Sequence, residues 1–343
     1  MAKKKSKKRY RLWIVLGVVA CVILAGVYST LFTAMTRTGS TEYVYIDNDD
    51  NIDSVLVKVK RLSTTDSYFF FRKLMLLSSY SDHIIPGRYR IGKEGALQTF
   101  RHISNGAQAP VSLTIKSVRT LDKLADDVSS KMMMKKADLL KALSSEATCK
   151  KYGYTPETII CMFLPNTYDF YWDISVDDFL QRMKKESDKF WTQERKEKAD
   201  QAKLTPCEVI TLASIVDEET DNEAEMPKIA GMYINRLNIG MRLQADPTVK
   251  YATKNFTAHR IYEKWLSVDS PYNTYRNKGL PPGPIRIPSV AAIDAVLNYV
   301  HHDYIYMCAK EDFSGTHRFA KTYDEHMVNA KRYAEALNKK NIK

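Results

Sequence analysis

The chain has 343 residues, of which 44% are hydrophobic and 27% charged, and this length suggests about two domains. Its formal net charge is +12, but seven positive side chains precede Leu12, so the remainder is only mildly basic. Such a surface is compatible with an acidic polymer or an anionic surface as partner. The five cysteines form no Cys-x-x-Cys pair and no Cys/His cluster with zinc spacing, so no metal site is predicted.

The N-terminus predicts a membrane anchor. A basic cluster at residues 1–11 precedes an uncharged apolar run over residues 12–36. At 1.5 Å per residue this run forms a helix of roughly 37 Å, enough to cross a ~30 Å hydrocarbon core. The basic cluster predicts a cytoplasmic N-terminus and a chain that continues outside. A cleaved signal peptide would have a shorter apolar core, and the position of the lysines against the span disfavours a nucleic-acid signal.

A strand-then-helix rhythm runs through residues 37–117. Alternating and periodic apolar residues predict strands at 42–46 and 111–115, a turn followed by a strand within 83–91, and helices at 52–62, 69–79 and 96–104. A small two-layer α+β unit of this kind either binds a ligand or serves as a spacer or docking domain. The sequence leaves both possibilities open.

Helices dominate the region over residues 118–343. They are predicted at 120–133, 137–143, 176–185, 186–203, 227–237, 289–300 and 323–337, with one strand at 304–309. Asp246 and Pro247 are typical of an N-cap and a first helical residue, so Asp246 is a capping residue or a second carboxylate of a site. The Pro- and Gly-rich run at 279–284 predicts a rigid loop. The fold class is therefore α+β, with a mainly helical second part.

The helix that begins after Thr205 carries the most informative pattern. Thr205, Pro206 and Glu208 form a capping-box start, which fixes the helix faces at about 100° per residue. On this wheel Glu219 lies on the flank of the apolar stripe, whereas Glu218 points toward water. A carboxyl among aliphatic groups has a raised pKa, as a general acid for glycosidic cleavage requires. The alternative is a helix that ends in a solvated acidic turn.

The cysteines leave the disulfide pairing open. Cys21 lies in the predicted membrane helix, and the other four allow three complete pairings: Cys149, Cys161, Cys207 and Cys308. Cys161 and Cys308 sit in apolar runs, so both are predicted to be free buried thiols.

Several separated blocks of sequence resemble the endolytic murein transglycosylases, a YceG/MltG-like family of membrane-anchored cell-wall enzymes. The blocks are Phe163–Tyr168, Leu212–Thr220, Asn235–Leu237, Gly240–Thr248, Ser270–Tyr275, Gly279–Ile285 and His317–Phe319 with Thr322. The resemblance implies a LysM-like α+β domain at 37–117 and a catalytic domain at 118–343. It also implies a single-pass protein of the inner (cytoplasmic) membrane, with its catalytic domain on the periplasmic side.

The same resemblance assigns roles to residues. The family's catalytic glutamate, which stands before Thr in its Ala-Ser-Ile block, corresponds to Glu219. Asp217 and Glu218 depart from the family's Glu and Lys, and their negative charge is expected to raise the pKa of Glu219 slightly. Polar and aromatic residues suited to a sugar-binding groove, or to ordinary loop packing, are Asn235, Gln244, Asp246, Tyr272, Asn273, Tyr275 and His317. Arg236 and Arg242 are candidates to meet stem-peptide carboxylates or local acids.

The implied reaction is non-hydrolytic cleavage of peptidoglycan between N-acetylmuramic acid and N-acetylglucosamine, in cell-wall biogenesis. Glu219 would act as acid and then as base, leaving 1,6-anhydromuramic ends. The implied partners are glycan strands, the membrane and cell-wall synthesis enzymes, with no cofactor and no nucleic acid. The alternatives are a hydrolytic muramidase, a non-enzymatic peptidoglycan-binding scaffold, and a cysteine transpeptidase that uses Cys207.

Overall fold

The computed structural model describes residues 2–258 and 261–340. Met1 of the predicted cytoplasmic tail, and residues 259–260 and 341–343 of the predicted catalytic domain, lie outside the described residues. The chain divides into two compact units. The first is built from the N-terminal 112 residues with 131–133 and 169–174, and the second from 113–130, 134–168 and the chain from 175 on. Helices and two-stranded sheets occur together, so the predicted α+β class is confirmed.

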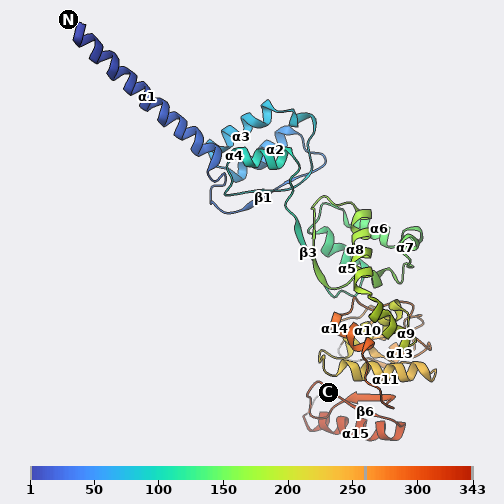
Figure 1. Cartoon of the computed structure of the whole chain (residues 1–343). Helices are drawn as coiled ribbons and strands as arrows, with labels where there is room; N and C mark the ends of the chain where they lie inside the picture. The colour runs from blue at the N-terminus through green and yellow to red at the C-terminus, as the bar shows by residue number, and fades with distance from the viewer. Residues whose placement is uncertain (1, 259–260, 341–343) are drawn as a thin grey trace. The chain divides into compact units, whose positions relative to one another are not determined.

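The N-terminal helix α1 (Ala2–Phe32) contains one stretch, residues 10–32, that is long and apolar enough to cross a membrane (Figure 1). Its 23 residues span roughly 35 Å as a helix. The helix ends before the predicted limit at residue 36, because Met35 is fully buried in the first unit and Thr36 bridges to Ser63. Apolar composition alone does not distinguish a lipid-facing residue from a core residue.

The first unit contains one antiparallel strand pair and three helices after α1. β1 (Glu42–Ile46) pairs with β2 (Gly87–Ile91), and Glu42 faces Ile91 in the register. The helices are α2 (Ile52–Leu62), α3 (Thr65–Leu77) and α4 (Ala96–Ser104), with the short 3₁₀ helix η1 (Ser79–Asp82) after α3. The predicted strand at 42–46 and the helices at 52–62 and 96–104 are confirmed, whereas α3 starts four residues before its predicted start at 69. The likeness of this unit to LysM stays a prediction.

The second unit is mainly helical. Its elements after β3 (Val111–Ile115) are α5 (Leu121–Ser129), α6 (Lys136–Leu143), α7 (Glu146–Lys151), η2 (Ile159–Met162), β4 (Asn166–Phe170), α8 (Val176–Phe190), α9 (Gln193–Gln201), α10 (Pro206–Glu219), α11 (Met226–Asn238), α12 (Asp246–Ala252), α13 (Glu263–Leu266), α14 (Val290–Leu297), β5 (Tyr306–Ala309), β6 (His317–Ala320) and α15 (Tyr323–Lys339). β3 pairs with β4, β5 pairs antiparallel with β6, and α15 packs on the β5–β6 hairpin (Figure 1).

Helix α10 lies at the centre of this unit and packs against α11, α12 and α14. Its start is as predicted, since Thr205 and Glu208 form the reciprocal bonds of a capping box and Pro206 occupies the first turn. Every residue from Val209 to Val216 is buried, so the helix is surrounded by the core on all sides until its last turn. Its acidic C-terminal turn is therefore held at a fixed place in the core.

Two boundary predictions differ from the structure for physical reasons. Asp246 is the first residue of α12 rather than its N-cap, which is Ala245, because the Asp246 side chain bonds to Tyr275 instead of the helix backbone. The polar stretch 186–203 is not one helix, since α8 ends at Phe190 and Thr192 caps α9 anew. The short strands β4 and β6 were not predicted: the partner of β4 is β3, which is distant in sequence, and β6 is only 4 residues long and pairs with β5 in a hairpin.

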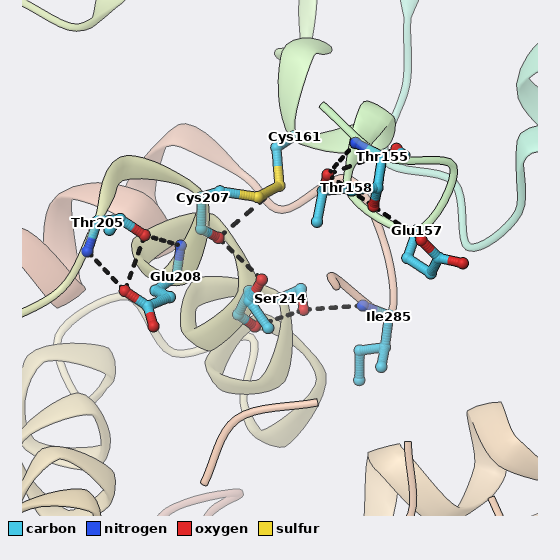
Figure 2. Close-up of a disulfide and its surroundings, with 10 residues drawn as sticks. Thr155, Glu157, Thr158, Cys161, Thr205, Cys207, Glu208, Ser214 and Ile285 are labelled. Atoms are coloured by element: carbon cyan, nitrogen blue, oxygen red, sulfur yellow. Dashed lines mark hydrogen bonds between the residues drawn. A yellow bond between two sulfur atoms is a disulfide. The ribbon is translucent and has the colours of Figure 1, made fainter. Parts of the chain in front are cut away.

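A disulfide joins Cys161 of η2 to Cys207 in the first turn of α10 (Figure 2). The prediction of a free Cys161 is wrong, because the two residues are 46 apart in sequence yet their Cα atoms lie 5.7 Å apart. Cys308 is free, as predicted, but only half-buried, and Cys149 is a buried free thiol. Cys207 has no free thiol, which removes the basis for a cysteine transpeptidase.

Candidate active site

The C-terminal end of α10 opens into a polar cavity of about 260 Å³ in the second unit. A cavity of about 340 Å³ lies at the other end of α10, beside the disulfide, but its lining is mainly apolar and aromatic. Besides the end of α10, four segments wall the smaller cavity: α11, the residues at the start of α12, the loop after α13 that carries Tyr275, and the β5–β6 hairpin. Its polar lining includes Glu219, Arg236, Gln244, Asp246, Tyr275 and His317.

Glu219 is the last residue of α10, and its half-buried side chain lines this cavity. The hydroxyl of Tyr233, a residue only 1% exposed on α11, donates a hydrogen bond of 2.6 Å to Glu219 Oε1. The pKa of Glu219 is raised to about 6; burial is the largest cause, the Tyr233 bond opposes the rise, and the negative charge of Asp246 adds to it. The raised pKa that the helical wheel predicted is confirmed. A carboxyl with this pKa keeps its proton at a higher pH than an ordinary glutamate and can donate it.

The neighbouring acids have different surroundings. Glu218 does not point toward water as predicted, because its carboxylate receives two bonds from Arg119, at 2.7 and 2.9 Å, and one from Arg286 at 3.0 Å. Asp217 accepts a bond from the Ser289 hydroxyl and lies 3.3 Å from the guanidinium of Arg286. Both acids are paired with cations and face away from the cavity lining. The expected effect of their charges on the pKa of Glu219 is therefore replaced by that of Asp246.

Asp246 and Tyr275 form a second polar pair in the cavity wall. The Tyr275 hydroxyl donates to Asp246 Oδ1 at 2.6 Å, and Asp246 is otherwise exposed. Gln244 also lines the cavity, on a backbone with a φ of 50°, and its N–H donates to the carbonyl of Thr274. Burial raises the pKa of Tyr275, so its hydroxyl stays protonated and remains a donor. This pair holds one carboxylate of the cavity in a fixed direction.

His317 enters the cavity from β6 and is held by Glu225, the residue just before α11. The Glu225 carboxylate accepts the His317 backbone N–H at 2.7 Å and binds the ring Nδ1 at 2.9 Å. Both side chains are nearly buried, at 10% exposed for Glu225 and 13% for His317. The ring is thus fixed at two points.

Three predicted residues lie outside the cavity lining. The Asn235 amide donates to the carbonyls of His302 at 2.6 Å and Tyr304 at 3.0 Å. Asn273 is fully buried and its amide donates to the carbonyls of Leu266 and Val268. Tyr272 packs on Tyr251, with ring centres 4.7 Å apart. These contacts show a role for all three in shaping the loops that carry the cavity residues.

Sequence reasoning did not assign site roles to Tyr233 and Glu225. Tyr233 has the spacing of a core residue, and only the fold shows that its hydroxyl meets a carboxyl. Glu225 carries no local signal, since its partner is 92 residues away. Arg236, a candidate to bind stem-peptide carboxylates, lines the cavity, but two of its N–H groups donate hydrogen bonds to the carbonyls of Ile305 and Leu243. Within residues 2–258 and 261–340, no group of three or more His, Cys, Asp or Glu side chains could hold a metal ion.

A carboxyl with a raised pKa, a carboxylate bound by Tyr275 and a histidine bound by Glu225 therefore line one polar cavity. The chain belongs to the YceG-like family, whose model matches residues 44–332.

Individual relatives agree with this assignment. The chain is 37% identical over 177 residues to the endolytic murein transglycosylase of Bacillus subtilis, covering 51% of this chain and 48% of that protein. It is 35% identical over 141 residues to the enzyme of the same name from Streptococcus pneumoniae, covering 40% of this chain and 25% of that protein. The chain thus aligns with half or less of these relatives. A yceG-like protein of Listeria monocytogenes has a similar structure, with a TM-score of 0.53, 28% identity, and coverage of 84% of this chain and 99% of that one.

Proposed function

We propose that the protein is a membrane-anchored lytic transglycosylase that cuts within peptidoglycan glycan strands during cell-wall biogenesis. The observation that carries this proposal is the carboxyl of Glu219, which has a pKa of about 6 and lines a polar cavity of about 260 Å³. The names of the relatives, endolytic murein transglycosylases, support the choice of polymer. The cavity offers hydroxyl, amide and carboxylate groups, which are the chemistry that binds sugars.

In the proposed reaction Glu219 protonates the oxygen that links N-acetylmuramic acid to N-acetylglucosamine. The bond from this oxygen to the muramic C1 breaks, and the muramic C6 hydroxyl bonds to C1 to give a 1,6-anhydro end. The proton of the C6 hydroxyl returns to Glu219, which acts first as acid and then as base. Because the nucleophile belongs to the substrate, its high effective concentration removes the need for a second carboxylate that activates water. Gln244, Asp246, Tyr275 and His317 are proposed to contact the sugars.

The proposed location is the outer side of the cytoplasmic membrane. The apolar stretch 10–32 would anchor the chain with its basic N-terminus in the cytoplasm. The Cys161–Cys207 disulfide supports an exported second unit, since structural disulfides persist in oxidising compartments. We propose that the first unit is LysM-like and that glycan strands, and enzymes of cell-wall synthesis, are the partners.

Two alternatives make different predictions. A hydrolytic muramidase would use the same acid with an activated water, and its products would have reducing ends. A peptidoglycan-binding scaffold would leave the strands intact. We favour cleavage because a scaffold gives no reason to keep a carboxyl buried at a raised pKa, which costs folding stability.

The test is digestion of purified sacculi with the full-length protein in detergent, followed by mass spectrometry of the products. The wild type is expected to produce anhydromuramic ends, and Glu219→Gln is expected to abolish them while circular dichroism stays unchanged. Glu223→Gln is the matched control, because Glu223 is exposed and only four residues away. Reducing ends from the wild type would indicate the hydrolase, and full activity in Glu219→Gln would refute the proposed acid.

A further inference from the structure

The Glu225–His317 pair has the geometry of a base held by an orienting acid. A carboxylate can only accept hydrogen bonds, so the 2.9 Å contact of Glu225 Oε2 requires that His317 Nδ1 carries the proton. In the neutral ring Nε2 then has a free lone pair. Among the described residues no hydrogen bond reaches Nε2, and this atom is not one of the buried unpaired ones. The ring therefore offers a proton acceptor to the cavity that it lines.

His302 shows that this arrangement is not the rule for histidines of the second unit. Its Nε2 contacts the carbonyl of Lys228 at 2.9 Å, and its Nδ1 accepts the Tyr304 N–H at 3.1 Å. Both ring nitrogens are used inside the fold, as expected for a structural histidine. In His317 only one nitrogen is used, and the carboxylate that binds it also fixes the backbone of β6.

Glu219 has limited freedom to carry out two proton transfers alone. Oε1 accepts the hydroxyl of Tyr233 at 2.6 Å, and Tyr233 is fully packed, so the carboxyl cannot turn without losing this bond. Only Oε2 is left to face the substrate. The departing oxygen and the attacking C6 hydroxyl are different atoms, so one fixed oxygen would have to serve two positions within one reaction.

We propose that His317, held by Glu225, is a second catalytic residue, whose Nε2 takes the proton from the attacking C6 hydroxyl and passes it back to Glu219. This inference rests on the proposed function and deepens it. It keeps Glu219 as the acid and as the final acceptor of the proton, and it adds His317 as the base that first takes this proton from the nucleophile.

The proton and bond changes balance. Glu219 gives its proton to the departing oxygen while the bond from that oxygen to C1 breaks. The C6 oxygen forms a bond to C1 and loses its proton to Nε2, so the imidazole becomes an imidazolium beside the Glu225 carboxylate. That carboxylate stabilises the positive ring. The imidazolium then transfers its proton to the Glu219 carboxylate, directly or through a water in the cavity, and both residues return to their starting states.

The test compares variants of the full-length protein in detergent, with isolated glycan strands as substrate. His317→Ala removes the ring but keeps the backbone N–H that binds Glu225. We expect kcat to fall about a hundredfold or more, in the range that a general base contributes, with the thermal midpoint little changed. Added imidazole is expected to restore part of the lost rate by filling the vacated space. His302→Ala is the matched control, and any loss that it causes is expected to follow stability and not to respond to imidazole.

A second variant tests the orienting acid. Glu225→Gln keeps an acceptor near Nδ1 but removes the charge that favours an imidazolium, so kcat should fall without loss of folding. In the double variant Glu225→Gln with His317→Ala, kcat should match that of His317→Ala alone, because Glu225 acts on the reaction only through the His317 ring. A His317→Ala protein with the wild-type kcat, or one whose loss imidazole does not relieve, would overturn the inference. In either case anhydromuramic products from the wild type and their absence in Glu219→Gln would leave the proposed function standing.

Discussion

Replacement of Glu219 by glutamine is predicted to stabilise the protein at neutral pH while it abolishes cleavage. The ordinary pKa of a glutamate is 4.5, and burial raises that of Glu219 to about 6. This difference makes ionisation in the folded state unfavourable by about 2 kcal/mol relative to the unfolded chain. Glutamine has the shape of the protonated acid and can still accept the hydroxyl of Tyr233. The variant therefore avoids the free-energy cost of an ionised side chain at position 219 in the folded state.

The sign of the effect depends on pH. Below pH 4.5 Glu219 is protonated in both states, so the wild type and the variant are expected to differ little. Between pH 4.5 and 6 the folded state holds the proton more tightly than the unfolded chain, and the wild type loses this advantage as the pH rises. Above pH 6 the full cost applies to the wild type alone. The advantage of the variant should therefore appear between these two values.

The assay is thermal unfolding of the full-length protein in detergent, followed by circular dichroism at pH 4 and pH 7.5. For a unit of this size about 2 kcal/mol corresponds to a shift of roughly 4–8 °C in Tm. The Tm difference between Glu219→Gln and the wild type should be larger at pH 7.5 than at pH 4 by this amount. The exposed control Glu223→Gln should show the same Tm difference at both pH values. An equal difference at both pH values, or a less stable variant at pH 7.5, would refute the account of Glu219 as a buried acid.

Two other perturbations follow from the same contacts. Asp246→Asn removes a negative charge that raises the pKa of Glu219. The alkaline limb of the plot of kcat/KM against pH should therefore move to lower pH. A limb that stays in place or moves to higher pH would contradict the role of this charge. The double variant Cys161→Ser with Cys207→Ser frees a 46-residue segment in the unfolded chain and should lose about 4 kcal/mol in urea unfolding. The same loss is expected for the wild type in excess dithiothreitol, and equal stability with and without reductant would show that the crosslink does not contribute.

The parts of the site that depend on contacts between residues close in sequence could be predicted. Thr205 and Glu208 are three residues apart, so the start of α10 and the flank on which Glu219 lies could be derived from helix geometry. The raised pKa followed from the same wheel, whereas the catalytic role of Glu219 stays a prediction. Asp246, Gln244, Tyr275 and His317 were selected by resemblance, and the structure brings them to one cavity.

The parts that could not be predicted depend on contacts between distant residues. A wheel for α10 alone turns Glu218 toward water, but Arg119 and Arg286, which are 99 and 68 residues away, cover that face. The free thiol expected at Cys161 was inferred from apolar neighbours, and those neighbours belong to a core against which the partly buried Cys207 packs. Asn235 and Asn273 have the chemistry of sugar ligands, and only the fold shows that backbone carbonyls occupy their amides.

The three consecutive acids at the end of α10 make the length of this helix part of the site. Asp217 meets Ser289, Glu218 meets two arginines, and Glu219 meets Tyr233. Each residue added or removed upstream would turn this triplet by about 100° and shift it by 1.5 Å. Such a slip would aim an ion-paired carboxylate at the cavity and leave two guanidinium groups without partners. A single-residue insertion or deletion within α10 is therefore expected to disrupt the site even where every side chain of the triplet is kept.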